Sequence, residues 1–285
     1  MLPKRQLKWA GLLATAATST LLLTGCSKQE LNGYLPLPDH GYATNHTSSI
    51  IGLWVTSWIV LLIVGAISWG LMAWAMVVYR RRKGDTGLPV QLRYNMPIET
   101  LFTVVPFIVT IGFFAFTAKT MTAIETPNNA TRIIQVIGKQ WAWDFNYTNS
   151  NVYDSGIQYQ DGANAGTESA LPTLYLEKDV PVEIDLTSRD VIHSFWVVQF
   201  LYKKDMFPGK VNRIYFTPTA LGTFEGKCAE LCGEFHSAML FNVKVVDKAE
   251  YDKHMADLAA AGQTGQLDFS LNRMQTLPGN KNLDN

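Results

Sequence analysis

One stretch near the carboxyl end, Gly226-Lys-Cys-Ala-Glu-Leu-Cys-Gly-Glu-Phe-His-Ser-Ala-Met239, holds two of the three cysteines, followed by a histidine and a methionine. A disulfide, a zinc site and a copper site compete to explain it. A disulfide between cysteines four apart would close a very small loop and add little stability. Structural zinc sites favour two residues between paired cysteines, and a thioether is a poor zinc ligand. Thiolate, imidazole and thioether are the soft ligands of copper electron-transfer sites, so copper is preferred.

The same stretch predicts its own surroundings. Its glycines and the Thr-Pro-Thr sequence before it indicate that the ligands come from a loop between strands. Two thiolates suggest two copper ions that share them, and each copper ion then needs an imidazole. His193, at the end of a predicted strand, is the stronger partner for the loop histidine, whereas His254 lies on a polar predicted helix and is weaker.

The residues around the loop predict an all-β domain over 119–261. Residues 132–137, 180–186 and 240–246 alternate between apolar and polar side chains, as half-buried strands do. Many short strands separated by turn signals favour a sandwich or a barrel.

Three further segments complete this part of the chain. Residues 247–261 have helical character, with Asp247 as the N-cap and Glu250 in the position of a capping box. Residues 149–169 are polar and glycine-rich and predict a long loop. Residues 262–285 predict a flexible tail or a strap bound by a partner.

The amino terminus has the layout of a secretory signal peptide over residues 1–25, with a basic start and a short apolar core. It closes with Leu23-Thr-Gly-Cys26, which resembles a bacterial lipobox, in which the cysteine is lipidated. The alternative is an ordinary signal peptide followed by a chance cysteine. If Cys26 is lipidated, residues 26–49 form a lipidated segment outside the cell membrane.

Two apolar stretches, residues 50–79 and 97–118, exceed the ~20 residues that cross a bilayer. The loop between them, residues 80–96, begins with Arg80-Arg-Arg-Lys83, which places it in the cytoplasm. The sequence therefore predicts a two-helix hairpin in a bacterial cell membrane with both chain termini on the outer face.

The charged residues argue against a nucleic-acid binder, and their distribution raises the question of an acidic docking surface. The 285 residues carry 24 basic and 24 acidic side chains, which argues against a nucleic-acid partner. Nine acidic residues lie between positions 144 and 190, and they are either a solvated surface or a docking face for a basic protein. They are Asp144, Asp154, Asp161, Glu168, Glu177, Asp179, Glu183, Asp185 and Asp190.

Two more runs, Gly138-Lys-Gln-Trp-Ala-Trp-Asp-Phe145 and Ser188-Arg-Asp-Val-Ile-His-Ser-Phe-Trp196, complete a pattern. With the hairpin and the Cys-x-x-x-Cys-x-x-x-His-x-x-Met loop, the chain resembles subunit II of cytochrome c oxidase, in the haem–copper oxidase family. The resemblance covers almost the whole mature chain in the family's order. Lys139 and Ala142 depart from the family, which often has His and Tyr there.

The resemblance implies a cupredoxin-like sandwich with the binuclear copper centre called Cu-A. Its implied copper ligands are His193, Cys228, Cys232, His236, Met239 and the backbone carbonyl of Glu230. It also implies that the Glu230 carboxylate binds magnesium at the junction with subunit I, although Glu230 fits a solvated loop acid equally well.

The resemblance gives two more residues a role. Trp141 matches the surface port where electrons enter, whereas the residues alone favour a core aromatic of a strand. Glu99 matches the mouth of a proton-uptake channel into subunit I, and its alternative is a merely interfacial carboxylate near the membrane boundary.

The expected function is therefore electron transfer within a proton-pumping oxidase. The chain would take electrons from cytochrome c, soluble or a membrane-anchored domain, and pass them to a haem in subunit I, where oxygen is reduced. Subunits I and III and membrane lipid are the expected partners. A quinol oxidase subunit is a rival, but those subunits lack the metal ligands. A membrane-tethered copper-binding or copper-delivery protein would leave Glu99, Trp141 and the hairpin unexplained.

Overall fold

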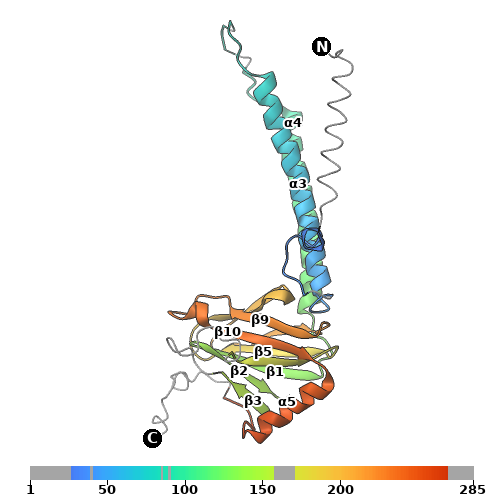
Figure 1. The fold of residues 1–285 in the computed structure, drawn as a ribbon. Coiled ribbons are helices and arrows are strands. Elements are labelled where there is room, and N and C mark those ends of the chain that lie inside the picture. The colour runs from blue at the N-terminus through green and yellow to red at the C-terminus, as the bar shows by residue number, and fades with distance from the viewer. Residues whose placement is uncertain (1–26, 39–40, 85, 89–90, 157–170, 269–285) are drawn as a thin grey trace, which may run out of the picture.

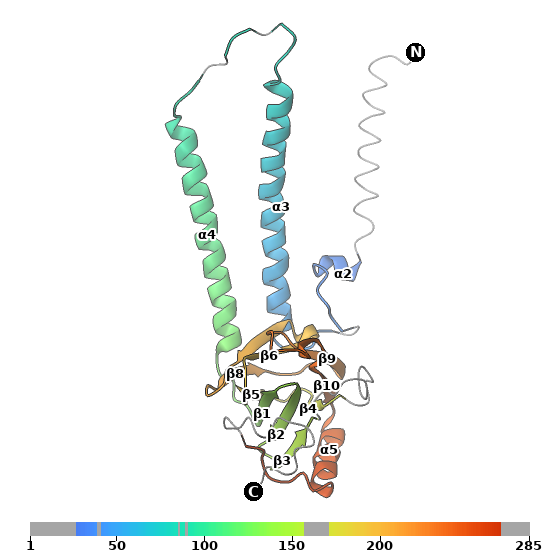
Figure 2. The same cartoon turned by 90° about the vertical axis from the view of Figure 1, so that its left-hand side faces the viewer.

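The computed structural model describes residues 27–38, 41–84, 86–88, 91–156 and 171–268. Two long helices rise from one end of a β-sandwich, and the loop that joins them lies at the tip farthest from it (Figures 1 and 2). The predicted signal peptide, residues 1–25, and the predicted lipidation site, Cys26, lie outside the described residues.

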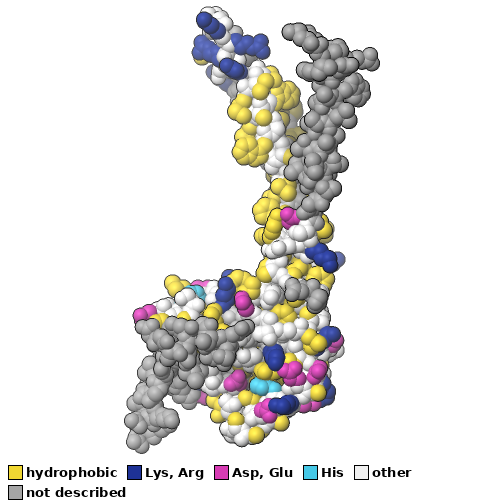
Figure 3. Space-filling view, in the orientation of Figure 1, with side chains coloured by type: hydrophobic (Ala, Val, Ile, Leu, Met, Phe, Trp, Pro, Cys, Tyr) yellow, Lys and Arg dark blue, Asp and Glu magenta, His cyan; other side chains and the backbone are white. Residues whose placement is uncertain are grey.

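The hairpin consists of α3 (Thr47–Val78) and α4 (Met96–Glu125), both long and apolar enough to cross a membrane. Most of their apolar side chains are exposed within this chain, as expected when lipid or other subunits cover a helix that is apolar all round. Basic side chains gather at the tip of the hairpin, where Arg80 to Lys83 lie (Figure 3). These features fit a membrane protein with two spans.

Both helices continue beyond the predicted spans towards the sandwich, since α3 begins three residues before position 50 and α4 ends seven residues after position 118. At the far end, the side-chain oxygen of Asn95 caps α4 by accepting the Ile98 N–H at 3.4 Å. Pro97 lies in the first turn, where a missing N–H leaves no helical hydrogen bond unmade.

The rest of the chain is the predicted sandwich, made of two five-stranded sheets. One sheet has the order β3 (Val152–Ser155), β2 (Ala142–Tyr147), β1 (Arg132–Lys139), β5 (Val182–Ser188), β8 (Asn212–Phe216). The other has the order β4 (Thr173–Glu177), β10 (Leu240–Val246), β9 (Gly222–Cys228), β6 (His193–Val197), β7 (Tyr202–Met206). Two short 3₁₀ helices lie in the connections between strands: η2 (Val198–Phe200) between β6 and β7, and η3 (His236–Ala238) between β9 and β10. Neighbouring strands are antiparallel except in the pairs β1–β5 and β4–β10.

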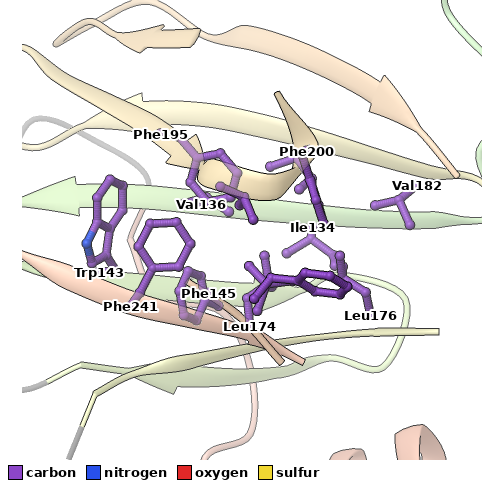
Figure 4. Packing of buried hydrophobic residues seen from close by; sticks show 14 of the residues in the cluster. Ile134, Val136, Trp143, Phe145, Leu174, Leu176, Val182, Phe195, Phe200 and Phe241 are labelled. Carbon is purple, nitrogen blue, oxygen red and sulfur yellow. The ribbon is translucent and has the colours of Figure 1, made fainter. Parts of the chain in front are cut away.

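Aromatic side chains fill one end of the core between the sheets (Figure 4). The ring of Phe241 lies 4.8 Å from that of Trp143 and 4.9 Å from that of Phe195, measured between centroids. The indole N–H of Trp143 donates to the carbonyl of Met239 at 3.4 Å, which satisfies the one polar atom of this buried ring. The aromatic core therefore contacts the Cys/His/Met loop at Met239 through this hydrogen bond.

The joint between hairpin and sandwich is held by polar contacts at both helices. At the end of α4, the Glu125 carboxylate accepts hydrogen bonds from the Tyr202 hydroxyl and the Lys204 ammonium of β7. Just before α3, a ring nitrogen of His46 lies 3.0 Å from the carbonyl of Tyr215, and Asn45 accepts the backbone N–H of Thr217 at 2.8 Å. Both helices are therefore tied to the strands nearest the hairpin.

Before this joint, the short helix α2 (Lys28–Leu31) has a capping box, and the segment after it packs on α3. There the indole N–H of Trp54 donates to the carbonyl of Gly33 at 3.0 Å. The segment after α2 thus contacts α3 near the end of the hairpin that adjoins the sandwich.

The loop predicted over 149–169 contains a strand. Val152–Ser155 form the edge strand β3, paired with β2, while residues 157–169 lie outside the described part of the chain. The polar composition hid this strand because an edge strand carries few apolar residues.

The start of the predicted flexible tail is docked rather than free. Gln263 accepts the Tyr153 N–H at 3.0 Å, and Asn146 exchanges two hydrogen bonds of 2.9 Å with the backbone of Leu267. This strap covers the open edge of β3, which would otherwise expose unpaired backbone groups. Residues 269–285 lie outside the described residues.

Asp247 caps α5 (Lys248–Ala260) as predicted, since its carboxylate accepts the Glu250 N–H at 2.8 Å. The predicted capping box is incomplete, because the Glu250 carboxylate instead binds the Lys244 ammonium at 2.6 Å.

Gly226 of β9 provides a test of the packing. A Cβ at this position would lie 2.2 Å from the ring of Phe241, so Gly226→Ala should force the aromatic core apart. We expect a loss of about 1–3 kcal/mol in the free energy of unfolding. Glu225→Ala, exposed on the same strand, should change it by less than about 0.5 kcal/mol. Urea unfolding of the full chain in detergent, followed by tryptophan fluorescence, measures both; equal stabilities would contradict the packing described.

Candidate metal centre

Strand register brings His193 to the Cys/His/Met loop, although they are far apart in sequence. β6 pairs with β9 so that Phe195 lies opposite Cys228, which puts the start of β6 beside the end of β9. The loop is closed at its base, because the Cys228 N–H donates to the carbonyl of Met239 at 3.0 Å. The Ala229 N–H donates to the carbonyl of Ser194 at 3.1 Å, which fixes the loop to β6.

Six donor atoms form a continuous chain of contacts at this corner. The two Sγ atoms of Cys228 and Cys232 are 3.8 Å apart. Nδ1 of His193 lies 3.8 Å from Cys228 Sγ, and Nδ1 of His236 lies 3.4 Å from Cys232 Sγ. Sδ of Met239 is 3.8 Å from Cys232 Sγ, and the carbonyl of Glu230 is 3.3 Å from Cys228 Sγ.

Hydrogen bonding between the two thiols separates their acidities. The contact with Cys232 holds the pKa of Cys228 far below its usual range, assisted by His193, even though burial opposes the charge. The same contact raises the pKa of Cys232. The pair therefore favours one thiolate before any metal binds, and metal charge would favour the second.

Asp190 orients the buried imidazole of His193. Its carboxylate lies 2.8 Å from Nε2 of His193 and accepts the Gln140 N–H at 2.7 Å. Burial lowers the pKa of His193, but the bond to Asp190 and the contact with Cys228 outweigh burial and raise it. Nδ1 is thereby turned to the sulfur atoms, as in metal sites whose histidines are held by carboxylates. Asp190 is part of the Asp-Val-Ile-His-Ser run, and its place three residues before His193 is the sequence signal for this orienting role, which was not predicted.

Trp141 lies against the same loop. Its indole N–H donates to the carbonyl of Cys232 at 3.2 Å, and the Gln140 amide donates to that carbonyl at 2.8 Å. Phe235 packs edge-to-face on the indole, with centroids 4.9 Å apart. At Gly233, where φ is +123°, a Cβ would come within 3.0 Å of the indole, so glycine permits the close approach.

The side chains of the other predicted residues are not among the donor atoms at this corner. Glu99 is in the first turn of α4, at the far end of the hairpin, where its carboxylate accepts the Asn95 N–H at 2.8 Å. Glu230 belongs to the loop itself, and its side chain is exposed. His254 is on α5 and stacks on Tyr175 with centroids 3.6 Å apart, and it is not among the donor atoms described above.

The described acidic residues between 144 and 190 do not form one exposed face, so the docking interpretation of the whole run is wrong; Asp161 and Glu168 lie outside the described residues. Asp144, Glu177 and Asp190 are buried and paired with Lys139, Arg132 and His193 respectively. Glu183 and Asp185 share Arg213. Strand alternation explains the result, because residues adjacent in sequence point to opposite faces of a sheet.

Similar proteins of known family identify the family of this chain. A family model described as cytochrome C oxidase subunit II, periplasmic domain, matches residues 132–246. The chain is 41% identical to the "Probable cytochrome c oxidase subunit 2" of Streptomyces avermitilis, with 90% of this chain and 89% of the relative covered. It is 30% identical to the cytochrome c oxidase subunit 2 of Mycobacterium bovis, with 89% of this chain and 82% of the relative covered.

A solved structure, the periplasmic domain of subunit II of cytochrome oxidase of Bradyrhizobium japonicum, is also similar. It has 26% identity and a TM-score of 0.43, and covers 48% of this chain and 99% of its own. The full-length relatives decide the assignment, because their similarity runs through both the hairpin and the sandwich. The chain belongs to the cytochrome c oxidase subunit 2 family.

Proposed function

We propose that this chain is the electron-accepting subunit of a cytochrome c oxidase. It takes electrons from a c-type cytochrome at Trp141 and delivers them, by way of a Cu-A centre, to a haem in subunit I of a proton-pumping oxidase. The observation that carries the proposal is the convergence of six soft or carbonyl donors at one corner of a rigid sandwich.

The donor set fits two copper ions. The Sγ–Sγ separation of 3.8 Å leaves the thiols free to bridge, whereas a disulfide would bring them to about 2.05 Å. Each thiol has its own imidazole, and the thioether of Met239 and the carbonyl of Glu230 would supply two further, weaker donors. Two cysteines and two histidines also satisfy zinc, but zinc leaves the buried thioether of Met239 without a role.

When bound, the copper pair supplies a one-electron store whose geometry changes little on reduction. The protein supplies orientation and cover. Asp190 fixes His193, and the aromatic core carries Met239. Both restrict movement of the ligands, which keeps the reorganisation during electron transfer small.

Trp141 is the proposed port for electrons. Its indole is only partly buried, and its N–H reaches the carbonyl of the ligand Cys232. A donor that contacts the ring therefore gains a short bonded path to the site. A basic donor such as cytochrome c would meet Glu234, which is exposed on this same loop.

The remaining assignments follow the family. Subunits I and III would cover the apolar hairpin in a bacterial cell membrane, with both chain termini outside. The Glu230 carboxylate would bind magnesium at the junction with subunit I. Residues 1–25 would be the signal peptide, and Cys26 the lipidated residue that begins the mature chain.

Cys232→Ser tests the metal site. A hydroxyl cannot replace a bridging thiolate, so the copper-loaded variant should lose the optical and electron-spin signature of a shared copper pair. Ser237→Ala, exposed in the same loop, should keep that signature. A normal two-copper spectrum in Cys232→Ser would refute the ligand assignment.

Trp141→Leu tests the port. Since the ring provides contact rather than ligation, reduction of the centre by cytochrome c should slow at least about tenfold, with the copper spectrum unchanged. Stopped-flow mixing of the purified oxidase with cytochrome c measures the rate. Trp196→Leu on β6 is the control, because that ring contacts the Lys227 ammonium and none of the metal-site donors described above. Equal rates in wild type and Trp141→Leu would remove Trp141 from this role.

Glu99→Gln tests the proton path. Turnover and proton uptake of the oxidase in vesicles should fall severalfold, while reduction of the copper centre stays normal. Thr103→Ala removes a hydroxyl that donates to the Glu99 carbonyl and leaves the carboxylate in place, so it should retain turnover. Full proton uptake in Glu99→Gln would return this carboxylate to an interfacial role.

A further inference from the structure

Three charged side chains are buried together on the outer side of the sheet that carries Trp141. Lys139, Asp144 and Arg189 are 8%, 1% and 2% exposed. The Lys139 ammonium lies 2.6 Å and the Arg189 guanidinium 3.4 Å from oxygens of the Asp144 carboxylate. The Ser155 hydroxyl donates to the same carboxylate at 2.7 Å. We call these three residues the ion cluster.

Burying such a cluster is expensive, and well-packed apolar side chains often serve stability as well or better. Its electric field, however, reaches its surroundings with little screening, because both water and salt are kept out. The position of the cluster relative to the metal-binding residues therefore matters.

β1 connects the ion cluster to the metal centre. Lys139 lies between Gly138 and Gln140, and neighbours in a strand point to the opposite face. A Cβ at Gly138 would meet the His193 ring at 2.9 Å, so this backbone lies directly on the imidazole. Gln140 donates its N–H to Asp190 and its amide to the carbonyl of Cys232.

Arg189 makes a second connection. It immediately precedes Asp190, which holds His193, and its own N–H donates to the carbonyl of Gly138 at 3.0 Å. The cluster and the ligands are thus separated by a single layer of backbone.

We propose that the ion cluster sets the reduction potential of the metal centre, with Lys139 and Arg189 raising it and Asp144 lowering it. The inference rests on the proposed function, because it needs a redox-active copper pair at this corner. Reduction adds a negative charge to the centre, so a nearby cation stabilises the reduced form and an anion destabilises it. Asp154 on β3 is a further acid near the ion cluster: burial and the charge of Asp144 raise its pKa, whereas the charge of Lys139 lowers it.

The test is a mediated potentiometric titration of the copper-loaded full chain in detergent, followed by the optical bands of the copper pair. Lys139→Gln and Arg189→Gln should each lower the midpoint potential, and Asp144→Asn should raise it. The double variant Lys139→Gln/Asp144→Asn leaves the sum of formal charges unchanged and should return close to wild type. These opposite signs are a signature that a merely structural role would not produce.

Matched controls come from α5, where Lys253 and Asp257 form an exposed ion pair. Lys253→Gln and Asp257→Asn should leave the potential unchanged, especially at high ionic strength, where the shifts from the cluster should persist. Should Asp144→Asn fail to fold, Lys139→Arg decides the matter, since it keeps the charge and should restore the potential that Lys139→Gln loses.

The two proposals fail in different ways. Normal copper spectra with unshifted potentials, or with shifts of the same sign in Lys139→Gln and Asp144→Asn, would overturn the role of the ion cluster alone. Absence of a two-copper spectrum in the wild-type chain would overturn both.

Discussion

The pairing of β9 with β6 on one side and β10 on the other is the constraint on which the site depends. β9 ends in Cys228, whose N–H closes the loop on the carbonyl of Met239, while Ala229 is tied to Ser194 of β6. These backbone bonds bring the loop donors and His193 to one corner. They restrict the loop, which lowers the ordering cost that a flexible loop would incur on binding.

A few specific contacts also join the hairpin to the sandwich. Glu125 at the end of α4 and His46 before α3 both bind strands of the sandwich, and these contacts restrict movement of the hairpin relative to the sandwich. In an oxidase, a fixed joint would hold the metal corner at a constant height and direction above the partner subunit. Electron transfer depends steeply on distance, and rigidity here serves function as directly as the ligands do.

Much of this could be predicted from the sequence because the signals were local. The apolar runs specify the two long helices, period-two alternation specifies β1, β5 and β10, and the spacing of Cys228, Cys232, His236 and Met239 specifies the candidate centre. β3 escaped prediction because its backbone pairing with β2 needs few apolar side chains. The strap escaped prediction because its contacts, such as the bond from the Tyr153 N–H to the Gln263 carbonyl, join residues more than 100 positions apart. The burial of Asp144 was also hidden, because its charge does not show which face of β2 carries the side chain. Asp190 lies in the bend between β5 and β6 and is buried at its contact with His193.

The proposed function requires that one corner of the sandwich hold two copper ions that share an electron. The most direct measurement is metal analysis of the wild-type full chain loaded with copper, together with its electron-spin resonance spectrum. Two copper ions per chain, with a hyperfine pattern from one unpaired electron spread over both nuclei, is the predicted result. A colourless chain that retains zinc, or a spectrum of a single isolated copper ion, would contradict it.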